Sequence, residues 1–304
     1  MPRAAGAETT AQNRRIEVIA IFGPTASGKS AVAEAVADAL GTEVVSADAL
    51  QVYRGLPVLT NQPERPTRLV GIRPLDAQMT VGEYAPLAHA QIDALVDECG
   101  TAVVSGGTGL YLRAALAELA VPPRVGEEML AETVRTVDED RAAAHARLES
   151  LDPAAAAVIH PNDTQRLVRA LSLAESGSSV VPLRDRLWAT ETRRTSLVVG
   201  LEIAAEVLER RIRTRAERMF AVGVVDEVRA ALDAPLARTV EKTLGLREIA
   251  ALPPGEALER IVVQTRRYAA YQQKWMRRIP NVVLLDGDRE ATEVAAEVLA
   301  LARS

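Results

Sequence analysis

Residues 23–30 combine glycines, a lysine and a hydroxyl group in a spacing that is suited to binding phosphate. Their sequence is Gly23-Pro24-Thr25-Ala26-Ser27-Gly28-Lys29-Ser30, which has the pattern GxxxxGKS. In such a loop the backbone N–H groups converge on one anion, the lysine reaches phosphate oxygens, and the serine hydroxyl is a ligand of Mg²⁺. The sequence therefore predicts a phosphate-binding loop, but the loop does not say which phosphate compound it holds.

The segments on either side of this loop fit the same chemistry. Ile16–Phe22 is an apolar run short enough for a buried strand, and an alanine-rich helical pattern follows from Ala31 to Leu40. A helix N-terminus adds partial positive charge where the loop would hold an anion. Strand, loop and helix in this order are the context that the motif requires, so a chance match is the weaker interpretation.

An acidic residue, Asp48, follows the next apolar run. Glu43–Asp48 is predicted to be the second strand, and ligands of open parallel sheets collect at the carboxyl ends of their strands. A P-loop NTPase needs such an acid to help hold Mg²⁺, and the strand predicted to end at Ser105 carries none. Asp48 and Gln51 also match a helix-capping box, which alone would explain both residues, although the two roles can coexist. Asp286, far along the chain, is interpreted as a solvated strand end.

The rest of the chain alternates strand and helix, as a parallel α/β sheet does. Residues 49–74 carry four prolines and are expected to form a long excursion, which at that length is more often functional than idle. Residues 125–194 are alanine-rich, charged and helical in pattern, and we interpret them as an insertion. Further strands are predicted over 101–105, 196–201 and 281–286, and further helices over 81–98, 204–222 and 256–279.

The predicted fold class is α/β: a P-loop NTPase-like parallel sheet flanked by helices, with an inserted all-helical domain. We expect a flexible N-terminal tail over 1–14, a core domain made of 15–124 and 195–304, and the helical insertion over 125–194.

Composition and charge limit the possible classes of protein. The chain of 304 residues is 48% hydrophobic, enough to bury a full core, and no apolar run reaches membrane-spanning length. Its single cysteine excludes an intrachain disulfide and a cysteine-rich zinc site. We expect a cytoplasmic protein. The net charge of −5 gives no overall attraction to nucleic acid, so a polyanionic partner would have to meet local basic patches.

Several segments, in this order and spacing, resemble the tRNA dimethylallyltransferase family. The likeness starts at the P-loop and continues almost to the C-terminus. The matching segments are 23–30, 46–55, 106–112 and 160–170, then Arg211-Ile212 with Arg215, 223–228, 245–248, and 265–269 with Gln272 and Trp275. Their combination is specific, because no other P-loop family known to us carries all of them.

The resemblance implies transfer of a dimethylallyl group from dimethylallyl diphosphate to N6 of the adenosine just 3′ of the anticodon. It implies Asp48 as general base, with Thr25 and Arg215 as further catalytic residues. Residues 23–30 would bind the diphosphate, and Ser30 would hold the cofactor Mg²⁺. A base is needed because the N6 lone pair is conjugated with the ring, and the leaving diphosphate needs cations and hydrogen-bond donors.

The resemblance also implies a tRNA-binding set. Its members are Asp48, Ala49, Leu50, Gln51, Thr108, Arg124, Gln165, Arg166 and Arg169. Two basic runs, within 210–218 and 266–278, could add RNA contacts. Tyr268, Tyr271 and Trp275 lie in the second run and would suit stacking on splayed bases, but the same spacing fits aromatics on an inner helix face. The implied partners are the anticodon stem-loop of tRNA and dimethylallyl diphosphate. We expect a monomer that does not associate with a membrane and has no obligate protein partner.

The chain departs from the family pattern in segments near the acceptor or the entry. Ala49 replaces a serine, Leu59–Pro63 replaces Gly-Thr-Ala-Lys-Pro, Pro66–Arg68 replaces Pro-His-His or Pro-His-Arg, and Ala270-Tyr271 replaces Lys-Arg. Two other functions stay open. An adenylate isopentenyltransferase would use the same donor and a free nucleotide, but the inserted helical region would then have little to do. A protein of a different class, an ATP-dependent P-loop kinase or nucleic-acid-binding switch, would release phosphate from ATP.

Overall fold

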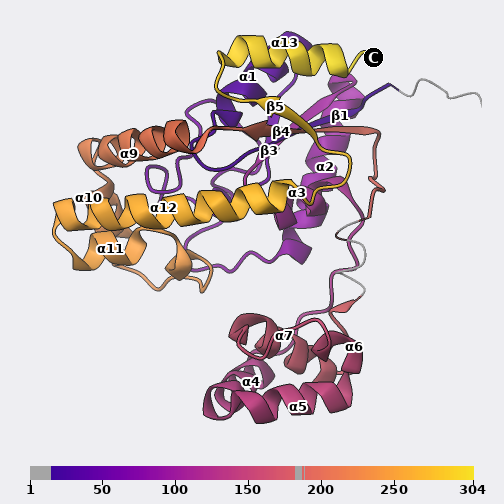
Figure 1. Ribbon diagram of the computed structural model, residues 1–304, viewed down its shortest axis with the longest axis vertical. Helices are drawn as coiled ribbons and strands as arrows, with labels where there is room; N and C mark the ends of the chain where they lie inside the picture. Colours follow the sequence, from indigo (N-terminus) through magenta and orange to yellow (C-terminus); the bar gives the residue numbers. More distant parts are fainter. Residues whose placement is uncertain (1–14, 182–186, 188) are drawn as a thin grey trace, which may run out of the picture.

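Five parallel strands form one sheet at the centre of the molecule (Figure 1). The computed structural model describes residues 15–181, 187 and 189–304, so the tail predicted over 1–14 lies outside the described residues. The sheet order is β2-β3-β1-β4-β5. The strands are β1 Val18–Phe22, β2 Val44–Ser46, β3 Ala102–Gly106, β4 Ser196–Glu202 and β5 Val283–Asp286. The predicted parallel α/β sheet is therefore confirmed, with strand ends shifted by one to two residues.

Helices cover both faces of this sheet. Helices α1 (Lys29–Leu40) and α13 (Ala291–Leu301) pack on one face. Helices α2 (Val81–Cys99), α3 (Gly109–Leu116) and α12 (Pro254–Met276) pack on the other. Side chains alternate along β1 between the two cores, and all five are buried, which explains its unbroken apolar sequence. In the part of the chain that the structure describes, no helix combines the length and apolar character needed to cross a membrane.

A second helical group extends beyond the carboxyl edge of the sheet. Helix α9 (Ala205–Ala221) lies along α12, and α10 (Val224–Ala231), the 3₁₀ turn η1 (Val240–Lys242) and α11 (Leu246–Ala251) follow (Figure 1). The helices predicted over 204–222 and 256–279 are confirmed as α9 and α12. Glu227 of α10 accepts the N–H groups of Val58 and Leu59, each at 2.8 Å. Helix α10 thereby holds the long excursion that the prolines indicate.

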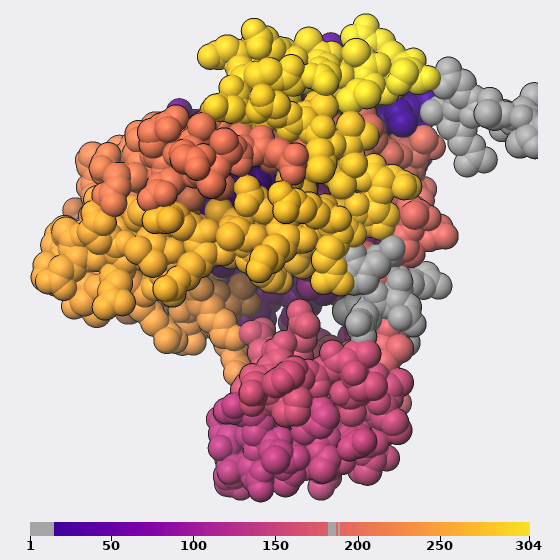
Figure 2. Space-filling view, viewed as in Figure 1, coloured from indigo at the N-terminus to yellow at the C-terminus, as the bar shows by residue number. Residues whose placement is uncertain are grey.

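Helices between α3 and β4 form a lobe of their own (Figures 1 and 2). They are α4 (Glu127–Glu139), α5 (Arg141–Leu151), α6 (Pro153–Ala156) and α7 (Thr164–Glu175), and they share a separate apolar core around Leu148, Leu167 and Leu171. Aspartates at the N-caps of α5, α6 and α7 accept backbone N–H groups at 2.9–3.2 Å, which explains where these helices begin. The exact domain boundaries stay predictions.

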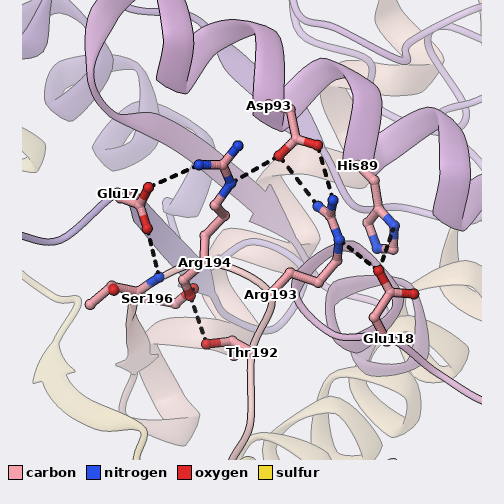
Figure 3. A network of polar contacts seen from close by, with 9 residues as sticks. Glu17, His89, Asp93, Glu118, Thr192, Arg193, Arg194 and Ser196 are labelled. Atoms are coloured by element: carbon pink, nitrogen blue, oxygen red, sulfur yellow. Dashed lines mark hydrogen bonds and ion pairs between the residues drawn. The ribbon is translucent and has the colours of Figure 1, made fainter.

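The chain returns from this lobe through an ion-pair network on the core (Figure 3). Arg193 pairs with Asp93 of α2 at 3.0 Å and with Glu118 at 2.8 Å. Arg194 pairs with the same Asp93 at 3.0 Å and with Glu17 at 3.0 Å. The hydrogen bond from Arg193 is the main reason why the pKa of Asp93 lies below its ordinary value. One carboxylate of α2 therefore holds two consecutive arginines just before β4 begins.

Buried Arg113 of α3 secures the same connection from inside. Its side chain is 1% exposed and donates to the carbonyls of Leu187 at 3.1 Å and Ala189 at 2.8 Å. These backbone carbonyls accept hydrogen bonds from a guanidinium group that has little access to water. Burial also lowers the pKa of Arg113. The return connection is thus fixed on α3 as well as on α2.

We predict that Asp93→Asn lowers the free energy of unfolding by about 1–2 kcal/mol, because both arginines lose a charged acceptor. Urea unfolding measures this change. Asp97→Asn is the matched control, because Asp97 is an exposed acid on the same helix and its replacement should change stability by less than about 0.5 kcal/mol. Equal stability of the two variants would contradict a stabilising role for the network.

Candidate active site at the carboxyl edge of the sheet

The predicted phosphate-binding loop lies between β1 and α1. Ala26 and Gly28 have positive φ values of 64° and 88°, which turn the chain sharply before Lys29 begins α1. The first N–H groups of a helix have no partner within the helix, so they remain available to an anion in front of it. The loop therefore has the backbone form that the motif predicts.

Asp48 reaches this edge because the chain after β2 passes unusually close to β3. A Cβ atom on Gly106 would lie 2.2 Å from the carbonyl oxygen of Ala47, so only glycine fits there. The N–H of Ala47 donates to the carbonyl of Ser105 at 2.7 Å, one residue beyond the end of β2. This close approach places Asp48 in the same pocket as Lys29, Ser30 and Gln51.

The interpretation of Asp48 as the cap of a helix is wrong, because no helix follows it. Its Oδ1 atom accepts the N–H groups of Leu50 at 2.9 Å and Gln51 at 3.4 Å, but residues 49–55 form turns and no helix. The Gln51 amide does not complete a capping box, because it accepts the hydroxyl of Ser46 at 2.9 Å and donates to the carbonyl of Asn61 at 2.8 Å. The turn thus fixes one carboxylate oxygen of Asp48. Within the described residues, Oδ2 accepts no hydrogen bond.

Two partly buried cations lie close enough to this carboxylate to interact with its charge. The pKa of Lys29 is lowered to about 8, mainly by burial; the charge of Asp48 acts against this shift, and the charge of Arg215 adds a smaller lowering. Burial also lowers the pKa of Arg215, again opposed by Asp48. Arg215 reaches in from α9 and donates to the hydroxyl of Thr25. The structure therefore brings the three predicted catalytic residues, Asp48, Thr25 and Arg215, together around the P-loop.

Thr108 and α12 form the opposite side of the site. The side chain of Thr108 forms a hydrogen bond with Tyr268, whose pKa is raised to about 12, mainly by burial and also by the charge of Asp48. A Cβ atom on Gly109 would lie within 2 Å of the Trp275 ring, so Trp275 packs on the inner face of α12. Tyr271, in contrast, is 53% exposed. Tyr268 is also exposed, at 38%, so the inner-face alternative is correct for Trp275 and wrong for Tyr268 and Tyr271.

The amide of Gln272, also on α12, belongs to the site although the motif match had given it no role. It accepts the N–H of Thr25 at 2.8 Å and donates to the carbonyl of Gly107 at 2.7 Å. Its one signal in the sequence was a polar residue at a position where the helix turns toward the core, between Ala269 and Met276.

Four of the residues predicted to bind tRNA lie away from this pocket. Gln165 and Arg166 are exposed on α7, and Arg166 is 3.4 Å from Asp163. Arg169 donates to the carbonyl of Pro123 at 3.0 Å, and Arg124 pairs with Glu83 of α2 at 2.8 Å. The structure thus separates the predicted set into residues at the sheet edge, 48–51 and Thr108, of which Asp48 and Gln51 line the pocket, and a group on the helical lobe and its linker.

Acidic residues from other elements form ion pairs with several arginines of the two basic runs, 210–218 and 266–278. The pairs are Arg211 with Asp288, Arg213 with Glu259, Arg218 with Glu64, Arg266 with Glu209, and Arg277 with Glu202. The run on α12 looks purely basic along the sequence, but α9 and β4 supply its acids. These runs are therefore less positive in the folded protein than their sequence indicates.

Comparisons with known proteins agree with this geometry. A family model described as IPP transferase matches residues 51–279, and a second, described as isopentenyl transferase, matches residues 16–73. A tRNA dimethylallyltransferase from Salinispora tropica is 36% identical, over 99% of this chain and 97% of the relative. One from Symbiobacterium thermophilum is 34% identical, over 95% and 96%.

A solved structure supports the same assignment. The full-length tRNA isopentenylpyrophosphate transferase from Bacillus halodurans superposes with a TM-score of 0.66 at 28% identity, covering 94% of this chain and 96% of that one. The family model, the relatives and the fold all agree, and this chain belongs to the IPP transferase family.

Proposed function

We propose that this protein transfers the dimethylallyl group of dimethylallyl diphosphate to N6 of the adenosine just 3′ of the anticodon of tRNA. Family membership supports the reaction class. The observation that carries the proposal is the carboxylate of Asp48 in one pocket with Lys29 and Ser30 of the P-loop. A phosphate-binding loop and a carboxylate with one unbonded oxygen are what a prenyl transfer to a weak nitrogen nucleophile requires.

The donor side stabilises the leaving group. As N6 bonds to the allylic carbon, the bond from that carbon to oxygen breaks and its electrons pass to the diphosphate. Lys29, Arg215 and the first N–H groups of α1 supply positive charge and donors where this charge collects. Both side chains are partly buried, so their attraction for the anion is stronger than it would be in bulk water.

The acceptor side removes the proton. Nitrogen N6 becomes more acidic as its lone pair enters the new bond, and Asp48 takes the proton that it loses. Because Oδ1 is held by the N–H groups of Leu50 and Gln51, Oδ2 is the oxygen that receives this proton. The adenine has to leave its stack to reach the pocket, as bases do in other enzymes that modify them.

Mg²⁺ fits the residues at this edge as a cofactor. The hydroxyl of Ser30 lines the pocket with Asp48, and the described residues contain no group of three acidic, histidine or cysteine side chains that could hold a metal alone. Mg²⁺ commonly binds through one or two protein oxygens together with phosphate oxygens and water. Bound there, it would neutralise charge on the diphosphate. The cytoplasmic location and the monomeric state stay predictions.

The reaction is tested with labelled dimethylallyl diphosphate and either bulk tRNA or AMP, followed by mass analysis of the nucleosides. We expect prenylated adenosine from tRNA and none from AMP. Label in AMP alone would support a free-nucleotide acceptor instead. Phosphate released from ATP without any prenyl donor would support a kinase or switch.

Asp48→Asn should lower kcat by about 10²-fold or more, because the amide keeps the shape of the side chain and removes the base. Affinity for tRNA and for the donor should change by less than about threefold. Single-turnover kinetics and equilibrium binding separate the two effects. Asp286→Asn makes the same change at the exposed end of β5 and should be neutral. A wild-type rate for Asp48→Asn would rule out the role of base.

Donor affinity should fall as the pH rises above about 8, the pKa of Lys29 in the free protein. Below that pH Lys29 is already charged. Above it, the polyanion binds only if Lys29 takes up a proton, so affinity decreases by up to about tenfold per pH unit. Calorimetry in buffers of different ionisation enthalpy should show uptake of about one proton at pH 9 and almost none at pH 7.

Two lysine variants identify the group that takes up this proton. Lys29→Met should bind the donor weakly and without proton uptake. Lys274→Met removes an exposed lysine of α12 and should behave like the wild type. Wild-type binding with no proton uptake at pH 9 would show that another group determines the pH dependence.

Arg166→Ala should weaken tRNA binding and reduce the slope of log affinity against log salt by about one, because one phosphate contact is lost. Donor affinity should not change. Arg229→Ala is a matched control, because Arg229 also pairs with an aspartate three residues earlier on an exposed helix face. An identical salt slope for Arg166→Ala and the wild type would place Arg166 outside the RNA interface.

A further inference from the structure

Gln272 is a buried polar residue whose two hydrogen bonds both end on the backbone of the candidate site. Its side chain is 3% exposed. Its Oε1 atom accepts the N–H of Thr25 in the P-loop at 2.8 Å, and its Nε2 atom donates to the carbonyl of Gly107 after β3 at 2.7 Å. One amide therefore joins the loops that follow two neighbouring strands.

The partners of this amide require glutamine. An N–H group can only donate and a carbonyl can only accept, so the residue between them must present one acceptor and one donor. A glutamate would set a second acceptor against Gly107, and a methionine would leave both backbone groups without a strong partner. Leaving buried polar groups unpaired costs about 1–3 kcal/mol each. Packing alone would be served by an apolar residue, as at the flanking Ala269 and Met276.

Each backbone partner of Gln272 leads to a side chain of the site. The hydroxyl of Thr25 accepts a hydrogen bond from Arg215 on the donor side. Gly107 is followed directly by Thr108, whose side chain contacts Tyr268 on the other side. Gln272 therefore stands between the group that would stabilise the leaving diphosphate and the group that would face the acceptor.

Helix α12 presses closely on the turn after β3. A Cβ atom on Gly107 would lie 2.5 Å from Nε2 of Gln272, and one on Gly109 would meet the ring of Trp275. Gln272 and Trp275 are three residues apart and lie on one face of the helix. The two glycines permit this approach, so the separation between α12 and the turn has little freedom.

We propose that Gln272 is a positioning residue, which holds Thr25 and the Gly107–Thr108 turn in the alignment that prenyl transfer needs. The proposal rests on the proposed function. Gln272 acts through Thr25 and Gly107 and does not itself touch the reacting atoms. A displacement of about 1 Å at a reacting centre can cost about 10²-fold in rate, and this sensitivity makes a single amide important.

Two substitutions at position 272 test the role. Gln272→Met keeps the size and removes both hydrogen bonds, whereas Gln272→Glu keeps the acceptor for Thr25 and loses the donor to Gly107. We expect kcat to fall by about 10²-fold for the first and by at least about tenfold for the second, with KM for tRNA within about threefold. Gln273→Met is the matched control, because Gln273 lies on the other face of α12, toward α9, and should leave kcat unchanged.

A double-mutant cycle tests the same contact from the other side. Gly107→Ala places a methyl group against the Gln272 amide, and Gln272→Ala opens the space for that methyl group. The double variant should lose no more in kcat than the worse single variant, because each change disturbs the same contact. Independent, additive losses would overturn the proposal. Thermal unfolding monitors the folding of each variant, and Gly107→Ala tests the contact if a Gln272 variant does not fold.

Hydrogen exchange gives a readout that does not depend on activity. The N–H of Thr25 should exchange at least about tenfold faster in Gln272→Met than in the wild type, and Gln273→Met should not change it. Unchanged protection, or a Gln272→Met enzyme within about threefold of the wild-type kcat, would overturn this inference alone. A wild-type protein that transfers no prenyl group would instead contradict the proposed function.

Discussion

The candidate site depends first on the parallel register of β1 with its two neighbours. Phe22, the last residue of β1, pairs with Gly106 of β3 and with Gly200 of β4. Strands β1 and β3 therefore end at the same level, whereas β4 continues two residues further to Glu202, and the loops that follow the three strands lie at one edge of the sheet. Because these strands are far apart in sequence, the register alone brings residues from the first and the second third of the chain to one edge. This register determines the positions of the P-loop, the turn after β3 and the start of α9.

A second constraint is electrostatic. Two partly buried cations, Lys29 and Arg215, lie near the carboxylate of Asp48, and burial lowers the pKa of both cations. Holding two cations away from water costs free energy. An anion that binds beside them would offset part of this cost. Elsewhere many arginines of α9 and α12 are already paired with acids, and the whole chain carries a net charge of −5. These paired arginines therefore add less positive potential to the surface than their number indicates.

The sequence was sufficient for features that depend on neighbouring residues, and insufficient for those that depend on distant ones. Apolar runs located all five strands, and an eight-residue motif located the phosphate-binding loop. The capping box at Asp48 failed because a local pattern does not show whether a helix follows. Gln272 lies 247 residues from its partner Thr25, so no local pattern could reveal its role. The acids that neutralise the basic run of α12 likewise come from other elements, such as Glu209 of α9.

The place of Asp48 in the sheet order separates this site from that of an ordinary P-loop NTPase. An acid that holds Mg²⁺ against the loop is expected at the end of a strand next to β1, but β3 ends in Gly106, where the carbonyl of Ala47 leaves no room for a side chain. Asp48 instead follows β2, which lies one strand further away, and two strand spacings correspond to about 10 Å. An acid at that separation leaves space for a reacting group between itself and the phosphate. The close contact at Gly106 therefore keeps an acid off the end of β3 and also holds the chain after β2 next to it, so that Asp48 lies where the proposed base would act.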